Sequence, residues 1–368
     1  MPDKHLDNDE AKGRAVASTR VVGLDIGTSA VRATEVAFGG GGPAAGGGTL
    51  LRFGQVELPP GAVRDGEVVE QAVVSHAIKQ LWQQAGFTTK DVVVGVGNQR
   101  VIVRELELPW MPLAQLKASL PYQVAELLPV AAGDALLDFV PTGESNGQRG
   151  RMVHGMLVAA QRDTVVANVL AVEGAGLRPS MVDLNAFALV RALTRGPHGA
   201  GVVAFVDIGA RVTNVVVAAN GVPALVRMIP TGGQHITDAV ATALGSSGPE
   251  AEGVKREIGL GFGAPAGLEP AAEAISGVAR QLVEAIRNTF VYYASNHPGA
   301  GIDGVVLSGG GAHLPGLGQY LSSSTRAAVA LGDALQGLKL GKTLDRSRLA
   351  GFESLVALPV GLAHGVAA

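Results

Sequence analysis

A short phrase that ends in Asp-Ile-Gly occurs twice in the sequence, at residues 21–27 (VVGLDIG) and again at residues 203–209 (VAFVDIG). Each copy is an apolar run typical of a buried strand, and a second strand-like run follows each. An aspartate at the end of such a strand can turn its carboxylate toward a metal ion, and the adjacent glycine lets backbone N–H groups turn toward a phosphate. One such turn is also an ordinary hairpin, because Asp and Gly are common turn residues. Two of them, each opening a half of similar design, predict two lobes that close over a nucleotide.

The first turn offers ligands for both parts of a magnesium-bound triphosphate. Backbone amides after Gly27 and the hydroxyls of Thr28 and Ser29 can hold β- and γ-phosphate oxygens. Asp25 can bind Mg²⁺ through water. The alternative is a plain hairpin turn capped by Asp and Ser.

The second turn has the same aspartate, Asp207, but fewer hydroxyl groups near it. The residues after Gly209 are Ala210 and Arg211, and neither side chain has a hydroxyl. The phosphate donors here are therefore mainly backbone amides, to which Thr213 can add a hydroxyl. We expect Asp207 to face the same Mg²⁺ through water.

A run of three glycines, Gly309, Gly310 and Gly311, follows the apolar residues 305–307. Glycines between a strand and a helix let a flat base and its α-phosphate approach the backbone closely. The run lacks the Gly-x-x-x-x-Gly-Lys-Ser/Thr pattern, so it is not a P-loop.

Glu252 and Lys255 are one helical turn apart and therefore lie on one face of a predicted helix. There they can bond the ribose hydroxyls and the base of a nucleotide. The alternative is a solvated ion pair, which is the more ordinary role for two such residues.

The elements that position these motifs form two mixed α/β halves with an insertion. In the first half the pattern predicts strands at 21–25, 30–38, 50–58 and 91–96 and a helix at 67–85. The insertion is predicted as strand–helix–strand–strand–helix, with strands at 101–108, 136–140 and 152–159, a polar loop at 143–151, and helices at 113–128 and 163–173. A helix at 181–193 leads to the second half, with strands at 202–207, 212–219, 224–229 and 305–307 and helices at 236–244, 274–295, 316–323 and 355–364.

Composition excludes several classes of function. The 368 residues carry a formal net charge of −3 and no cysteine, so there is no basic surplus that indicates nucleic-acid binding and no thiolate metal site. The sequence contains no run of 18 or more uninterrupted apolar residues, so no membrane span is predicted. Residues 1–19 mix charged and small residues and are expected to form a disordered leader.

Taken in order, the two Asp-Ile-Gly turns, Glu-x-x-Lys and the three glycines resemble the actin-like ATPase superfamily, which includes actin, chaperone ATPase domains, sugar kinases and FtsA. Within it, the sequence is most similar to the PilM family of type IV pilus assembly proteins. The phrases that carry this resemblance are VGLDIGTSAVRATEV at 22–36, the PLAQL and ELLP segments within 108–129, VDLNAFALVRAL at 182–193, Thr231-Gly232-Gly233, and LSGGGAHLPGL at 307–317.

The resemblance implies an α/β fold of the actin-like (ribonuclease H-like) type, a two-domain clamshell with an inserted FtsA-type α+β module. It implies ATP and Mg²⁺ as cofactors, with Gly232 and Gly233 also at the nucleotide. It further implies a cytoplasmic scaffold, peripheral at the inner membrane, that binds the N-terminal tail of the membrane protein PilN in a groove beside the module. Self-association fits the same resemblance.

On this resemblance the domains are expected at 20–97 with 179–200 (1A), 98–178 (1C), 201–231 with 303–368 (2A), and 232–302 (2B). Asn185 falls where relatives place a Gln, Glu or Asp that orients the attacking water. An amide can position water but cannot take a proton, so we expect slow or absent hydrolysis, with ATP acting mainly as a structural and switching ligand. Asp183 is the weaker candidate, because the predicted helix points it to another side.

Two other functions are compatible with the same superfamily. An FtsA-like anchor of division filaments ends in an amphipathic membrane helix, whereas residues 355–368 lack a basic face. A small-molecule kinase needs a general-base Asp, and Asn185 stands where that Asp is expected.

Overall fold

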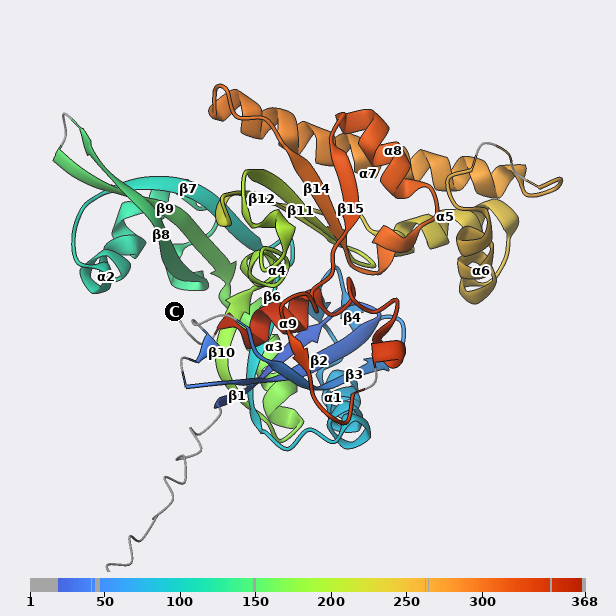
Figure 1. Ribbon diagram of the computed structural model, residues 1–368, viewed down its shortest axis with the longest axis horizontal. Coiled ribbons are helices and arrows are strands. Elements are labelled where there is room, and N and C mark those ends of the chain that lie inside the picture. Colours follow the sequence, from blue (N-terminus) through green and yellow to red (C-terminus); the bar gives the residue numbers. More distant parts are fainter. Residues whose placement is uncertain are drawn as a thin grey trace, which may run out of the picture.

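The computed structural model describes residues 19–40, 42–43, 47–147, 150–261, 263, 265–344 and 346–365. The predicted disordered leader therefore lies outside the described residues, except for Thr19. Figure 1 shows two large lobes, one above the other, with a third, smaller unit to one side of the upper lobe.

The lower lobe is built on a six-stranded sheet with the order β10-β6-β1-β2-β3-β16. Its strands are β1 (Thr19–Ile26), β2 (Ala30–Phe38), β3 (Thr49–Glu57), β6 (Asp91–Val96), β10 (Arg178–Leu184) and β16 (Lys339–Leu340). Alternate residues of β1 serve two cores: Val22 and Leu24 pack with α1 (Gln71–Ala85) and α3 (Arg162–Gly174), and Val21 packs on the opposite face. A two-stranded ribbon, β4 (Val63–Arg64) with β5 (Glu67–Val68), lies before α1.

The upper lobe repeats this plan around a five-stranded sheet with the order β13-β12-β11-β14-β15. Its strands are β11 (Val202–Ile208), β12 (Thr213–Ala219), β13 (Val222–Ile229), β14 (Gly304–Ser308) and β15 (Ala328–Leu331). One face is covered by α5 (Gly233–Leu244), α7 (Glu269–Asn296) and α8 (Leu317–Thr325), and α6 (Gly248–Ile258) packs beside α5.

Two helices, α4 (Asn185–Leu193) and α9 (Ala357–Ala363), lie between the two sheets. They share one core with Val21 of the lower sheet and Phe205 and Val216 of the upper sheet. Glycines allow the close fit: a Cβ on Gly23 would lie 2.0 Å from the Pro359 carbonyl oxygen, and one on Gly361 would lie 1.8 Å from that of Ala188. The two lobes are therefore joined by helices packed backbone to backbone.

The inserted module has a separate three-stranded sheet with the order β7-β9-β8. It comprises β7 (Val101–Pro109), α2 (Leu113–Gln123), β8 (Ala135–Gly147) and β9 (Gly150–Gln161). Its small core includes Leu108, Leu116, Leu120, Phe139 and Leu157.

Several predicted boundaries differ from the structure. Residues 181–184 are strand, not helix, because β10 pairs in parallel with β6 at the edge of the sheet. The helix predicted at 113–128 ends at Gln123, two residues after Pro121, which cannot continue the helical hydrogen bonding. The polar loop predicted at 143–151 is largely strand, since β8 and β9 pair as far as Gly147 and Gly150.

Two predicted domain limits are corrected as well. Helix α3 falls within the predicted module 98–178, yet its Ala171 and Val172 belong to the core under the lower sheet. The segment 303–368 was expected in the upper lobe, but β16 pairs with β3 and α9 packs on β1, both in the lower lobe. In both cases an apolar face fits either lobe, and only tertiary packing decides between them.

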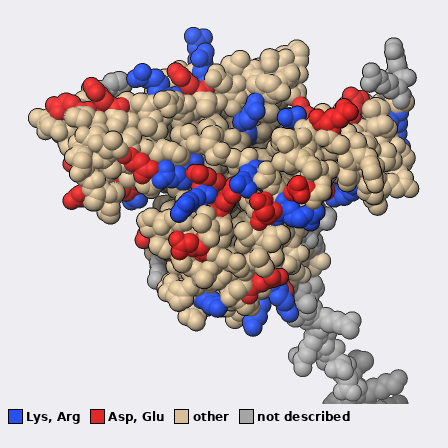
Figure 2. Space-filling view, turned by 180° about the vertical axis from the view of Figure 1, so that it is seen from behind, with Lys and Arg blue, Asp and Glu red and all other residues tan. Residues whose placement is uncertain are grey.

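No helix among the described residues is long and apolar enough to span a membrane. On the face shown in Figure 2, acidic and basic side chains are interspersed along the band between the lobes, and neither sign forms a continuous patch there.

Candidate functional site

The two predicted carboxylates occupy equivalent places in the two sheets. Asp25 is near the end of β1 and Asp207 near the end of β11, and each side chain belongs to a residue only 5% exposed. Each strand forms a hairpin with the next, and the amides of Gly27 and Gly209 close the turns by donating to the Ala30 and Val212 carbonyls, at 3.0 Å in both. Those two amides are therefore already used within the hairpins and are not free to donate to a phosphate.

Asp25 has a cationic neighbour that the sequence prediction does not include. Arg32 is its register partner on β2, and Arg32 Nη1 lies 3.7 Å from Asp25 Oδ2. The Arg32 Nε donates to Gln55 Oε1 at 2.8 Å, which holds the guanidinium beside the turn. Burial raises the pKa of Asp25, and the charge of Arg32 opposes that rise. The signal for Arg32 is its distance of seven residues from Asp25, which places it opposite once the hairpin register is known.

Asp207 has no such cation on its neighbouring strands. Its partner on β12 is Asn214, and its partner on β14 is Ser308. Burial, reinforced by the charge of Asp25, raises the pKa of Asp207 to about 6, and a hydrogen bond with the Asn214 side chain acts in the opposite direction. The charge of Asp25 therefore acts on Asp207 although the two residues belong to different lobes. A divalent cation between the two carboxylates would relieve their repulsion.

The glycines of the upper lobe pack against the Asp207 turn. A Cβ on Gly309, whose φ is +81°, would lie 2.7 Å from Asp207 Oδ1, and one on Gly311 would lie 2.4 Å from Ile208 Cγ2. A Cβ on Gly232 would lie 2.4 Å from the Gly209 carbonyl oxygen. The structure therefore brings three predicted segments together: Gly209-Ala210, Gly232-Gly233 and the glycine run 309–311, whose last two residues begin the 3₁₀ turn Gly310–His313.

Three predicted phosphate ligands are already bonded within the upper lobe. The Gly233 amide donates to the Gly209 carbonyl at 2.9 Å, and the Thr213 hydroxyl donates to the Thr231 carbonyl at 2.7 Å. The Arg211 guanidinium lies 2.6 Å from Asp238 Oδ2 of α5. These bonds fix the conformation of the turn. A phosphate that binds the Arg211 guanidinium would have to compete with Asp238 for it.

Glu252 and Lys255 form an ion pair on α6, as spacing predicts, but the lysine is buried. Lys255 Nζ lies 2.6 Å from Glu252 Oε2 and donates to Thr237 Oγ1 at 2.9 Å and to the Gly233 carbonyl at 3.2 Å. The lysine therefore ties α6 to the first turn of α5. Glu252, whose side chain is 31% exposed, is the better placed of the two to meet a ribose.

The two residues predicted for catalysis, Asp183 and Asn185, have different surroundings. Asp183 is on β10, where its carboxylate pairs with Arg191 and accepts from the Leu184 amide at 2.8 Å. Asn185 is the first residue of α4, and its side chain packs on β6: a Cβ on Gly95 would lie 2.2 Å from Asn185 Oδ1. That buried oxygen has no hydrogen-bond partner within the described part of the chain. Neither residue is a free carboxylate base.

A charged residue of the lower lobe also acts on a histidine of the upper lobe. Burial and the charge of Arg211 lower the pKa of His235, while the charges of Asp238 and Asp65 oppose this. Asp65 lies in the turn between β4 and β5, whereas His235 is in the first turn of α5. The charge of Asp65 in the β4–β5 turn thus acts on a residue of the upper lobe.

Metal binding at this place would depend on the nucleotide. Within the described residues, no group of three or more His, Asp or Glu side chains is arranged to hold a metal ion. A cation between Asp25 and Asp207 would therefore take its remaining ligands from phosphate and water.

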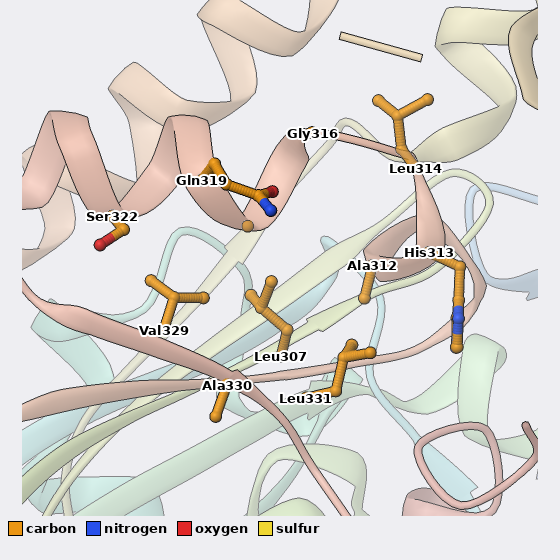
Figure 3. Close-up of a pocket in the computed structure, with 11 residues that line it drawn as sticks. Leu307, Ala312, His313, Leu314, Gly316, Gln319, Ser322, Val329, Ala330 and Leu331 are labelled. Atoms are coloured by element: carbon orange, nitrogen blue, oxygen red, sulfur yellow. The ribbon is translucent and has the colours of Figure 1, made fainter. Parts of the chain in front are cut away.

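A separate cavity of about 470 Å³ lies at the edge of the upper sheet. Figure 3 shows Leu307, Val329 and Leu331 of the sheet on one side and Gln319 and Ser322 of α8 on the other. None of the predicted site residues lines it, so it is not the predicted nucleotide site.

The paired lobes, each with an Asp-Ile-Gly hairpin, define an actin-like ATPase fold. The chain resembles MreB5 of Spiroplasma citri bound to ADP in fold, with 13% identity, a TM-score of 0.53, and coverage of 93% of this chain and 94% of that one. It is 26% identical to the cell division protein FtsA of Bacillus subtilis over 267 residues, 66% of this chain. The match spans 58% of FtsA, less than two thirds of that relative's length.

The family model described as type IV pilus assembly protein PilM matches residues 23–365, and the chain belongs to this family. A solved PilM-PilN type IV pilus biogenesis complex contains a chain that is 27% identical, with a TM-score of 0.82 over 94% of this chain and 98% of that one. The predicted fold class and family are therefore confirmed.

Proposed function

We propose that this chain is an ATP-binding scaffold of type IV pilus assembly that binds the N-terminal cytoplasmic tail of a PilN-like inner-membrane protein. The family match over residues 23–365 supports the pilus role, and the likeness to the PilM chain of a PilM-PilN complex supports the partner. Through that partner the chain would be held at the cytoplasmic face of the inner membrane.

Magnesium and a nucleoside triphosphate fit the residues around the two hairpins. Glycine is required at 232, 309 and 311 because a Cβ there would meet atoms of the Asp207–Ala210 turn, so these three segments pack directly around that turn. Asp25 and Asp207 would hold the metal through water, and Arg32 adds the cation that a phosphate chain needs. When bound, Mg²⁺ would neutralise phosphate charge and orient the triphosphate.

The observation that carries the nucleotide proposal is the convergence of Asp25 and Asp207. Two buried carboxylates, 182 positions apart in the sequence, interact strongly enough for one to raise the pKa of the other. Burying two like charges together is costly unless a cation joins them. A magnesium-bound triphosphate supplies that cation at the place where both turns converge.

Slow hydrolysis follows from what surrounds the triphosphate. Asn185 has an amide rather than a carboxylate, and Asp183 is engaged by Arg191. Neither group is suited to take a proton from an attacking water. We therefore infer that ATP serves mainly to hold the two lobes in one arrangement that the partner recognises.

A groove of about 70 Å³ at the base of the inserted module is our candidate for the partner peptide. It is lined by Gln99 and Arg100, which precede β7, by Ile102 of β7, by Pro129 and Val130, and by Ala135, Ala159 and Gln161 of the neighbouring strands. Two exposed leucines are close in sequence to these lining residues: Leu127, at 38% exposure, precedes Pro129, and Leu136, at 36% exposure, follows Ala135. An extended peptide can bury apolar side chains there, while backbone and polar contacts set its register.

The proposal is tested by titrating the protein with the N-terminal peptide of a neighbouring PilN-like protein, with and without Mg²⁺-ATP. Saturable binding of both ligands to the wild type is expected. Ile102→Asp should weaken peptide binding at least tenfold, about 1.4 kcal/mol, and leave ATP binding unchanged. The control Val222→Asp changes an exposed aliphatic residue of β13 outside the groove and should leave both unchanged. Failure of the wild type to bind the peptide refutes the partner, and equal loss in both variants refutes the groove.

A further inference from the structure

The starting observation is a buried amide beside Asp207 that is only half satisfied. Asn214 lies on β12, directly opposite Asp207 in the register, and is 4% exposed. Its side chain hydrogen-bonds Asp207. Its Oδ1, however, has no hydrogen-bond partner among the described residues.

The chemistry of the pair fixes how the amide is oriented. An ionised carboxylate only accepts hydrogen bonds, so the group that faces Asp207 must be the Nδ2 donor of Asn214. The carbonyl Oδ1 is then directed to a different partner. Leaving such a buried acceptor unpaired is costly, so a donor from outside the protein would be favoured at this oxygen.

The location of Asn214 indicates which donor that is. The charged side chains that act on Asp207 from the neighbouring elements are Asp25 and Arg32, both of the facing lobe. A cation held by Asp25 and Asp207 through water would carry its hydration shell into this space. Water bound to Mg²⁺ donates hydrogen bonds and accepts none through its metal-bound lone pair, so it matches a free carbonyl oxygen.

We propose that Asn214 is a positioning residue of the metal site, whose Nδ2 orients Asp207 and whose Oδ1 accepts a hydrogen bond from a magnesium-bound water. The inference rests on the proposed function, because it requires a hydrated metal between the lobes. It assigns to the upper hairpin a water-binding role, in contrast to the cationic side chain at the matching position of the lower hairpin.

The chain has a matched control for this residue. Asn168 is also buried, at 3% exposure, and its Oδ1 also lacks a partner among the described residues, but it lies on α3 under the lower sheet. Removing its amide changes burial and hydrogen bonding in a comparable way without touching Asp207.

The test is a Mg²⁺ titration at fixed ATP, followed by calorimetry, together with ATP binding in EDTA. Asn214→Ala should raise the Mg²⁺ midpoint about tenfold and change ATP affinity in EDTA less than twofold. Asn214→Asp, which keeps the shape but adds a carboxylate, should weaken ATP binding in EDTA and lower the Mg²⁺ midpoint. Asn168→Ala should give the wild-type midpoint. A purely structural role for Asn214 would not move its two variants in opposite directions.

Four results overturn the proposal. A wild-type protein that binds no ATP at any Mg²⁺ concentration removes the proposed function and this inference together. A wild type with Mg²⁺-dependent binding and an Asn214→Ala midpoint within twofold of it removes this inference alone. So does an Asn168→Ala midpoint shifted as far as that of Asn214→Ala. Should Asn214→Ala fail to fold, the Asn214→Asp midpoint decides, and an unchanged value refutes the proposal.

Discussion

The two Asp-Ile-Gly hairpins share a backbone plan but differ in the residue opposite the aspartate. In the lower lobe Asp25 faces Arg32 across the hairpin, whereas in the upper lobe Asp207 faces Asn214. The first carboxylate is therefore partly neutralised by the protein itself. Burial and the charge of Asp25 raise the pKa of the second carboxylate, Asp207, to about 6.

This difference gives the two hairpins different tasks around one ligand. A guanidinium beside the first turn favours the negative charge of a phosphate chain. The carboxylate beside the second turn has an amide rather than a cation opposite it in the hairpin, which favours binding of a metal cation there. On our proposal, a similar backbone in both halves gives a side that favours phosphate and a side that favours the metal, and the asymmetry comes from one residue on each second strand.

The largest effect is expected from removing the aspartate of the metal side. Asp207→Ala should abolish the gain in ATP affinity that Mg²⁺ provides, so the affinity for ATP with Mg²⁺ should fall at least 100-fold, or about 2.8 kcal/mol. Asp25→Ala should also abolish ATP-dependent thermal stabilisation, because it removes the other carboxylate of the pair. Melting curves with ATP, with and without Mg²⁺, measure both. An unchanged melting shift in either variant would refute its part in the site.

The pH dependence of the unliganded chain should separate the two aspartates. The folded pKa of Asp207 is about 6 and the unfolded value is 3.8, so the folded state holds the extra proton between these values. Stability should therefore fall as pH rises from 4 to 6, by an amount on the order of 2 kcal/mol. Asp207→Asn should remove this decline. Asp25→Asn should remove less, because Arg32 opposes the rise in the pKa of Asp25. Equal pH profiles for the wild type and Asp207→Asn in chemical denaturation would contradict the difference.

The cation of the phosphate side should have a smaller effect that does not depend on the metal. Arg32→Ala should weaken ATP binding about tenfold, about 1.4 kcal/mol, equally with Mg²⁺ and with EDTA. Arg32→Lys should recover part of the loss, since it keeps the charge without the fork geometry. If calorimetry shows that the loss appears only with Mg²⁺, the assignment of Arg32 to the phosphate side is wrong.

The smallest effect concerns turnover. Asn185→Glu supplies a carboxylate at the start of α4 and should raise the rate of ATP hydrolysis a few-fold, with ATP affinity unchanged. Asn185→Gln, which keeps the amide, is the matched control. Phosphate release measures the rates, and no increase for Asn185→Glu counts against a limiting role of Asn185.

Much of this arrangement could be predicted from the sequence because it is local. The apolar runs that end in Asp-Ile-Gly predict both hairpins, and glycine spacing predicts the run at 309–311. The Glu252–Lys255 pair follows from helical spacing alone. These features depend on neighbours within a few residues.

The rest depends on pairing and packing that no local pattern contains. Arg32 and Asn214 become relevant only once each hairpin register sets them opposite an aspartate. Residues 181–184 are predicted as the start of the helix at 181–193, and only the parallel pairing of β10 with β6 separates them from α4. Lys255 is tied to the Gly233 carbonyl by the packing of α6 on α5, which helical spacing does not predict.

A crystal structure of the chain with Mg²⁺ and a non-hydrolysable ATP analogue gives the most direct answer. We predict one Mg²⁺ in the space between Asp25 and Asp207, with the triphosphate along the Arg32 side and water between the metal and both carboxylates. A nucleotide bound elsewhere, or a metal that neither aspartate reaches through water, would contradict the assignment of the two hairpins.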